Sequence, residues 1–147
     1  FNVLRLDGGV ARLMSTVRLD GWVGNVFVRG KKAYTSIQRY QWEPMGDGSS
    51  SVRLAEIDLT NPRRPVVRGS AAQRGWGWLL GVEGDRAILT SGWGQQGIDI
   101  YKLGAGAPTF ESFVRTRGWW TSDLARQGNR LLLASGYWGV QAIDLPR

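Results

Sequence analysis

The hydrophobic and polar positions of the chain alternate in short runs, and a helical period of 3.6 residues appears nowhere convincingly. Residues 25–28 alternate, residues 29–32 form a polar turn that contains a glycine, and residues 33–36 continue as a second strand. Two further strands, 52–59 and 66–70, follow and are separated by a proline-rich break. The pattern therefore predicts groups of four short antiparallel strands.

Three landmarks recur in the same order along the chain, which indicates an internal repeat. A Gly-Trp pair comes first, a glycine-containing turn follows about nine residues later, and an Ile-Asp-Leu or Ile-Asp-Ile triplet comes last. The pairs begin at Gly21, Gly75 and Gly118, the turns at Gly30, Gly84 and Gly128, and the triplets at Ile57, Ile98 and Ile143. The first unit is longer because a polar insertion lies at roughly 38–51. Removing the excess leaves a unit of about 43 residues, which is typical of a β-propeller blade.

The repeat divides the chain into four parts. Residues 1–20 are predicted to be the end of a preceding blade, 21–74 and 75–117 two blades of four antiparallel strands, and 118–147 a final blade that lacks its outer strand. This inventory of about three and a quarter blades falls short of the roughly four to eight of closed propellers. We therefore expect an all-β partial β-propeller, part of a larger ring completed by an upstream segment or a second copy, since open sheet edges invite pairing. An incomplete four-bladed toroid is the less favoured alternative.

The repeat resembles bacterial propeller repeats of the LVIVD type and the related secreted proteins with a C-terminal β-propeller domain. The first unit carries the resemblance most fully, with V-x-V-x-G-x-x-A-Y in residues 26–34, I-D-L-x-N-P-x-x-P in residues 57–65, and then Gly69-Ser70. The resemblance implies an extracytoplasmic location, whether secreted, periplasmic or cell-surface. It also implies a binding or scaffold role, because such propellers share no catalytic set of residues.

The 147 residues include no His and no Cys, and this composition excludes many catalytic mechanisms. The chain therefore has no imidazole base, thiolate nucleophile, disulfide or zinc-thiolate site, and we expect no metal and no cofactor. No apolar segment approaches the roughly 20 residues that span a bilayer. Nucleic-acid binding is disfavoured despite the net charge of +7, because the basic residues form no extended block. Whether the chain is an enzyme stays uncertain, with a non-enzyme favoured.

The eight tryptophans and 21 glycines allow two interpretations. In the favoured one, the Gly-Trp pairs pack between neighbouring sheets, the glycine permitting close approach and the tryptophan filling the wedge. In the other, part of a ring of tryptophans is exposed and binds a ligand or a protein partner. Strand order places the tryptophans at one end of the blades and the cationic turns at the other. The best candidates for ligand or partner binding lie outside the repeated pairs and are Trp93, Trp120, Tyr137, Trp138, Tyr40 and Trp42.

A carboxylate recurs in each triplet, at Asp58, Asp99 and Asp144. Since the three occupy the same place in the repeat, we expect a shared structural hydrogen-bonding role rather than a catalytic one. A carboxylate pair could still hydrolyse glycosides without histidine, but no supporting motif accompanies the acidic residues.

The expected function is that of a non-catalytic β-propeller portion serving protein interaction or assembly in an extracytoplasmic bacterial protein. One alternative is a carbohydrate-binding or carbohydrate-processing propeller that uses the tryptophan-rich face. Another is the propeller part of a larger enzyme whose catalytic residues lie elsewhere. The expected partners are the remaining blades, from the upstream part of the same precursor or from a second copy, and a glycan or protein ligand.

Overall fold

The computed structural model describes residues 1–40, 50–91, 96–118 and 121–145. In these segments the chain forms thirteen strands and one short 3-10 turn. The strands are β1 (Asn2–Asp7), β2 (Val10–Thr16), β3 (Trp22–Arg29), β4 (Lys32–Tyr40), β5 (Ser50–Asp58), β6 (Val66–Ala72), β7 (Leu79–Glu83), β8 (Arg86–Ser91), β9 (Gly97–Lys102), β10 (Thr109–Arg115), β11 (Asp123–Gln127), β12 (Arg130–Ala134) and β13 (Val140–Asp144). The 3-10 turn, η1, is Gly136–Trp138.

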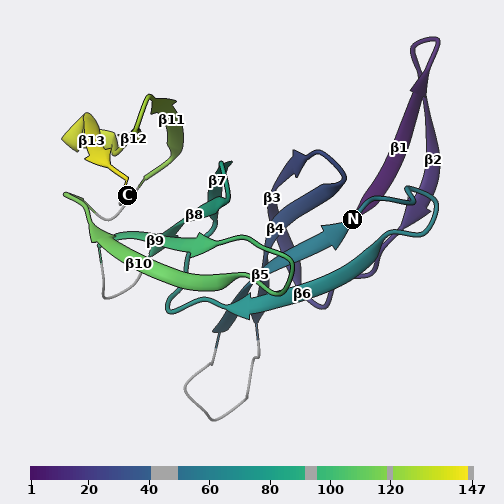
Figure 1. Ribbon diagram of the computed structural model, residues 1–147, viewed down its shortest axis with the longest axis horizontal. Coiled ribbons are helices and arrows are strands. Elements are labelled where there is room, and N and C mark those ends of the chain that lie inside the picture. Colours follow the sequence, from purple (N-terminus) through teal and green to yellow (C-terminus); the bar gives the residue numbers. More distant parts are fainter. Residues whose placement is uncertain (41–49, 92–95, 119–120, 146–147) are drawn as a thin grey trace.

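The strands form four antiparallel sheets in which each strand pairs with its neighbour in the sequence. We name them sheet I (β1–β2), sheet II (β3–β6), sheet III (β7–β10) and sheet IV (β11–β13). Figure 1 shows the sheets following one another along an open arc, with the β1–β2 hairpin projecting at one end and sheet IV at the other. The all-β prediction is confirmed, and the four sheets contain two, four, four and three strands. The described residues do not close into a ring.

The hairpins within the sheets turn on the predicted glycines. Two-residue turns join β3 to β4, β7 to β8 and β11 to β12, and each begins with a glycine at positive φ. The φ angles are 57° at Gly30, 63° at Gly84 and 61° at Gly128. Such turns match the twist of the strands that they join, and they need a residue that tolerates positive φ. The threefold glycine landmark therefore marks one turn conformation used three times.

Two hydrophobic cores join the sheets in series, with sheet III between them. The core between sheets II and III includes Tyr34, Leu54, Leu89 and Tyr101, and the core between sheets III and IV includes Ile88, Ile98, Ile100, Leu131 and Leu133. Adjacent residues of β8 thus enter different cores, because side chains alternate between the two faces of a strand. This explains why sheet III has almost continuous apolar strands, whereas sheet I, at the end of the arc, leaves apolar side chains exposed.

The polar insertion predicted at 38–51 is shorter than expected. Strand β4 extends through Gln38 to Tyr40, and β5 already begins at Ser50. The ladder continues through the pairs Gln38↔Val52 and Arg39↔Ser51. Polar residues on both sides of the hairpin concealed these pairs from a pattern based on hydrophobicity. No helix in the described parts of the chain is long and apolar enough to cross a membrane.

Candidate functional site

Three tryptophans from two successive sheets line one groove. The groove has a volume of about 420 Å³ and contains Trp22, Trp76 and Trp78. Trp22 opens β3 and is 72% exposed, whereas Trp76 and Trp78 precede β7 and are half-buried. The other lining residues are neutral, namely Gly24, Asn25, Gln38 and Ser122. The arrangement is therefore a concave aromatic surface with a few uncharged polar groups.

Gly77 allows the segment that carries two of these tryptophans to lie directly against β8. A β-carbon at this position would collide with the backbone carbonyl of Thr90. The close approach is sealed by hydrogen bonds in both directions: the Thr90 amide donates to the Trp78 carbonyl at 2.9 Å, and the Trp78 amide donates to Thr90 Oγ1 at 2.9 Å. Trp76 and Trp78 are thereby fixed two residues apart along an anchored segment.

Two amide side chains of sheet II bridge to the same segment. Gln38 Nε2 donates to the Gly77 carbonyl at 3.2 Å, and Asn25 Nδ2 donates to the Leu79 carbonyl at 3.3 Å. Gln38 is only 8% exposed, so its orientation is fixed by packing as well as by this bond. Its Oε1, like Oδ1 of Asn25, accepts no hydrogen bond from the described residues. The groove therefore contains hydrogen-bond acceptors whose positions are set in advance.

The favoured interpretation of the Gly-Trp pairs is wrong for the first pair. Gly21 does allow a close approach, since a β-carbon there would lie 2.5 Å from the Gln38 carbonyl oxygen and its φ is 143°, but the approach is to β4 of its own sheet and not to a neighbouring sheet. Trp22, however, points outward and fills no wedge, because the space between sheets II and III is occupied by residues such as Tyr34 and Leu54. Sequence reasoning had no signal that separates the two residues of the pair.

The six candidate binding residues fall mostly outside the part of the chain that the structure describes. Trp42, Trp93 and Trp120 lie outside it, and so does the side chain of Tyr40. Tyr137 and Trp138 form part of η1, where Tyr137 is fully exposed and Trp138 is 60% exposed. Neither of these two lines the tryptophan groove, although Trp138 contacts Gly118, the glycine of the third pair.

The three recurring aspartates do not share one register, which corrects the sequence prediction. Asp58 pairs with Lys32 and Asp144 with Arg130, the first residues of their respective partner strands. The residue of sheet III in that position is Lys102, opposite Arg86, whereas Asp99 lies three residues earlier, opposite Leu89. The alignment of residues 98–100 with the other two triplets is therefore wrong by three residues. Because the offset is an odd number, Asp99 lies on the opposite face of its strand from the one predicted.

The environment of Asp99 differs from the environments of Asp58 and Asp144. Asp58 accepts a hydrogen bond from the Thr60 amide at 2.7 Å and pairs with Arg68 at 2.9 Å, and these bonds lower its pKa to about 2. Asp144 pairs with Arg130 at 2.7 Å. Asp99 is 1% exposed, and neither of its carboxylate oxygens has a hydrogen-bond partner among the described residues. Burial raises the pKa of Asp99, while the charge of Arg74 opposes the rise.

Asp99 alone does not make a catalytic site. Hydrolysis by carboxylates needs two of them at a defined separation, and no group of three or more potential metal ligands occurs among the described residues. We therefore treat Asp99 as a feature of the interface between sheets II and III.

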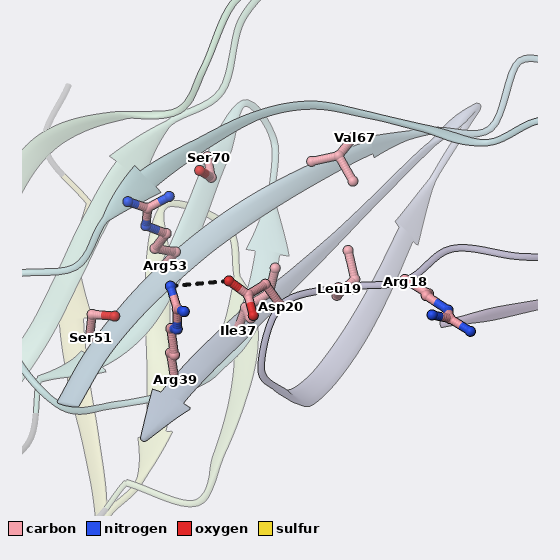
Figure 2. Close-up of a pocket in the computed structure, with 9 residues that line it drawn as sticks. All are labelled: Arg18, Leu19, Asp20, Ile37, Arg39, Ser51, Arg53, Val67 and Ser70. Atoms are coloured by element: carbon pink, nitrogen blue, oxygen red, sulfur yellow. Dashed lines mark ion pairs between the residues drawn. The ribbon is translucent and has the colours of Figure 1, made fainter. Parts of the chain in front are cut away.

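A second cavity, of about 260 Å³, lies on the face of sheet II that is turned toward sheet I. Figure 2 shows its arginines, Arg18, Arg39 and Arg53, with the ion pair between Arg39 and Asp20 at 3.1 Å. The guanidinium of Arg53 lies beside Ser70, whereas that of Arg18 extends away from the other side chains. Because the three cations do not converge and one is already paired, this cavity is a weaker ligand site than the tryptophan groove.

Comparison with known protein families and with curated proteins gives no match to this chain.

Proposed function

We propose that the chain is an open segment of a β-propeller that serves protein assembly, its end sheets being completed by strands from further polypeptide. The observation that carries the proposal is the series of sheets with two, four, four and three strands. The two inner sheets are complete four-stranded units, and the two outer sheets are short of that number. The extracytoplasmic location implied by the resemblance to LVIVD-type repeats is part of the same proposal.

The end of the arc near β1 supports this reading. Along the arc the first strands of successive sheets contact each other, β3 with β7 and β7 with β11. The opposite side of β3 has no such neighbour in the described chain, and a cavity of about 480 Å³ separates β1 from Val23, Val26 and Val28. Val28 is 64% exposed there. A further inner strand pairing with β1 would cover these valines.

At the other end of the arc, β13 has an edge that is unpaired in the described part of the chain. Among the described strands β13 pairs only with β12, so sheet IV has no strand in the position that β6 and β10 occupy in sheets II and III. Val140, the first residue of β13, is 70% exposed. One added outer strand would satisfy the free backbone groups of this edge.

The test is to express residues 1–147 alone and to measure their mass by light scattering and their backbone protection by hydrogen exchange. We expect self-association, and fast exchange of β1 and β13 in whatever monomer remains, because both edges lack a partner. A monodisperse monomer that unfolds cooperatively, with β1 and β13 as protected as β8, would refute the proposal.

A further inference from the structure

We propose that the tryptophan groove binds a neutral oligosaccharide. This site lies at the starts of β3 and β7, away from the free edges of β1 and β13, so the proposal stands independently of the assembly role. It assigns the groove to Trp22, Trp76 and Trp78 together with Gln38 and Asn25.

The aromatic side chains form a surface of the right kind for a sugar ring. Trp22 is exposed and Trp76 and Trp78 are half-buried, so the groove is lined by three partly accessible indoles rather than by one isolated exposed side chain. Here three indoles meet on one concave surface, and the volume of about 420 Å³ falls within the roughly 300–1,000 Å³ of small-molecule sites. The flat face of an indole can pack against the C–H face of a pyranose ring while the ring hydroxyls point to the sides.

The polar groups supply what the hydroxyls of such a ring require. Gln38 is more than nine-tenths buried, and its Nε2 is already committed to the Gly77 carbonyl, which leaves Oε1 without a partner among the described residues. Oε1 is not one of the fully enclosed polar atoms, so it stays accessible at the wall of the groove. A ligand hydroxyl that donates to Oε1 would satisfy it, and Asn25 Oδ1 offers a second acceptor on the same wall.

The absence of charge selects the class of ligand. Of the residues that the structure describes, seven line the groove, and none of these seven has a side chain that is charged near neutral pH. Arginine and lysine are the usual binding residues for carboxylated, sulfated or phosphorylated ligands. Arg18, Arg39 and Arg53 line a separate cavity on the opposite face of sheet II. A neutral sugar chain is therefore favoured over an acidic polysaccharide and over a peptide anchored by a charged terminus.

The experiment uses the full protein in the assembly that it forms, applied to an array of neutral and acidic oligosaccharides and then titrated calorimetrically with each glycan that binds. We expect binding of neutral glycans, and a loss of at least tenfold in affinity for Trp22→Ala and for Gln38→Leu. Trp22→Phe should retain part of the affinity, because a smaller aromatic ring remains.

Trp138→Ala is the comparison variant, since it removes another exposed indole that does not line the groove. Circular dichroism checks that each variant folds as the parent does. The proposal is overturned if no neutral glycan binds, if only acidic glycans or peptides bind, or if Trp138→Ala abolishes binding while Trp22→Ala leaves it intact. A negative result here would leave the assembly role standing, because that role is measured by mass and not by glycan binding.

Discussion

At the scale of single residues, the chain places chemically identical side chains in opposite electrostatic situations. Asp58 is solvated, hydrogen-bonded and paired with Arg68, while Asp99 is enclosed between two sheets with Arg74 and Tyr101 as its electrostatic neighbours. Hydrogen bonds that favour the charged form lower the pKa of the first, and loss of water raises the pKa of the second. These two aspartates, from sheets II and III, therefore make opposite contributions to the pH dependence of stability.

Asp99→Asn should stabilise the protein near neutral pH. The pKa of Asp99 is raised in the folded state, whereas in the unfolded chain it is 3.8. Between these two pKa values the folded state keeps a proton that the unfolded chain has released. The free energy of unfolding therefore falls as the pH rises from the unfolded pKa to the folded pKa. The amide cannot ionise, so it removes that loss, although its own polar atoms stay buried without a partner among the described residues. We therefore expect a gain in stability that comes only from the absence of a buried charge. Urea unfolding near pH 7 and near pH 4 measures it, and the gain should shrink at the lower pH.

Asp58→Asn is the matched control with the opposite sign. The folded pKa of Asp58 is about 2 against 3.8 unfolded, so its contribution is complete above the unfolded value and is lost as the pH falls toward 2. The substitution should therefore destabilise the protein near neutral pH and make the acid limb of the stability curve shallower. If both variants changed stability in the same direction at neutral pH, the assignment of the two environments would be wrong.

At this scale the sequence predicts properties that the local backbone conformation determines, and it does not predict properties that depend on which residues pack nearby. The turn glycines were predictable, because a two-residue hairpin imposes positive φ regardless of what packs nearby. The register of Asp99 was not, because Ile-Asp-Ile satisfies the same alternation in either alignment. The exposure of Trp22 was equally hidden, since it depends on how closely two sheets approach.

At the scale of elements, the short segment before β7 links the groove to the fold. Its backbone is held on β8 by Thr90, and its carbonyls receive the amides of Gln38 and Asn25 from sheet II. The segment therefore connects sheet II with sheet III at the point where the tryptophans gather.

Gly77→Ala should break this connection. The added methyl group meets the Thr90 carbonyl, which is backbone and cannot turn away, so the segment must shift. Overpacking of this kind costs about 1–3 kcal/mol, and the displaced tryptophans should weaken glycan binding as well. Thermal unfolding and the calorimetric titration measure the two effects. Gly106→Ala is the matched control, because a β-carbon there meets nothing within 4 Å and both properties should stay unchanged.

The strands themselves could be predicted from the sequence with their grouping into sheets, because each sheet is a meander whose pairs are neighbours in the chain. Alternation and turn residues suffice for such local pairing. The ends of β4 and β5 were missed, because Gln38 and Arg39 are polar and their pairing is dictated by the backbone ladder alone.

At the scale of the whole molecule, the free edges of the arc determine how the chain associates. Val140→Lys places a charge at the start of β13, where an added strand would bury it. We expect the self-association of residues 1–147 to weaken about tenfold, which corresponds to roughly 1.4 kcal/mol. Sedimentation equilibrium measures it.

Val66→Lys is the control, because Val66 is similarly exposed but begins β6 in a complete four-stranded sheet. Equal weakening by the two substitutions would show that added charge acts through general repulsion, and the role of the β13 edge would be refuted.

Sheet III is packed on both faces, and β1 and β13 lie toward opposite ends of the arc (Figure 1). This arrangement has a mechanical consequence, because separate cores join sheet II to sheet III and sheet III to sheet IV, sheet I contributes to neither core, and every described strand pairs within its own sheet. If the chain were stretched by its two ends, sheets I and IV would peel away first and sheet III would yield last. A force–extension trace should then show several separate unfolding events, the last of them from sheet III, rather than a single rupture.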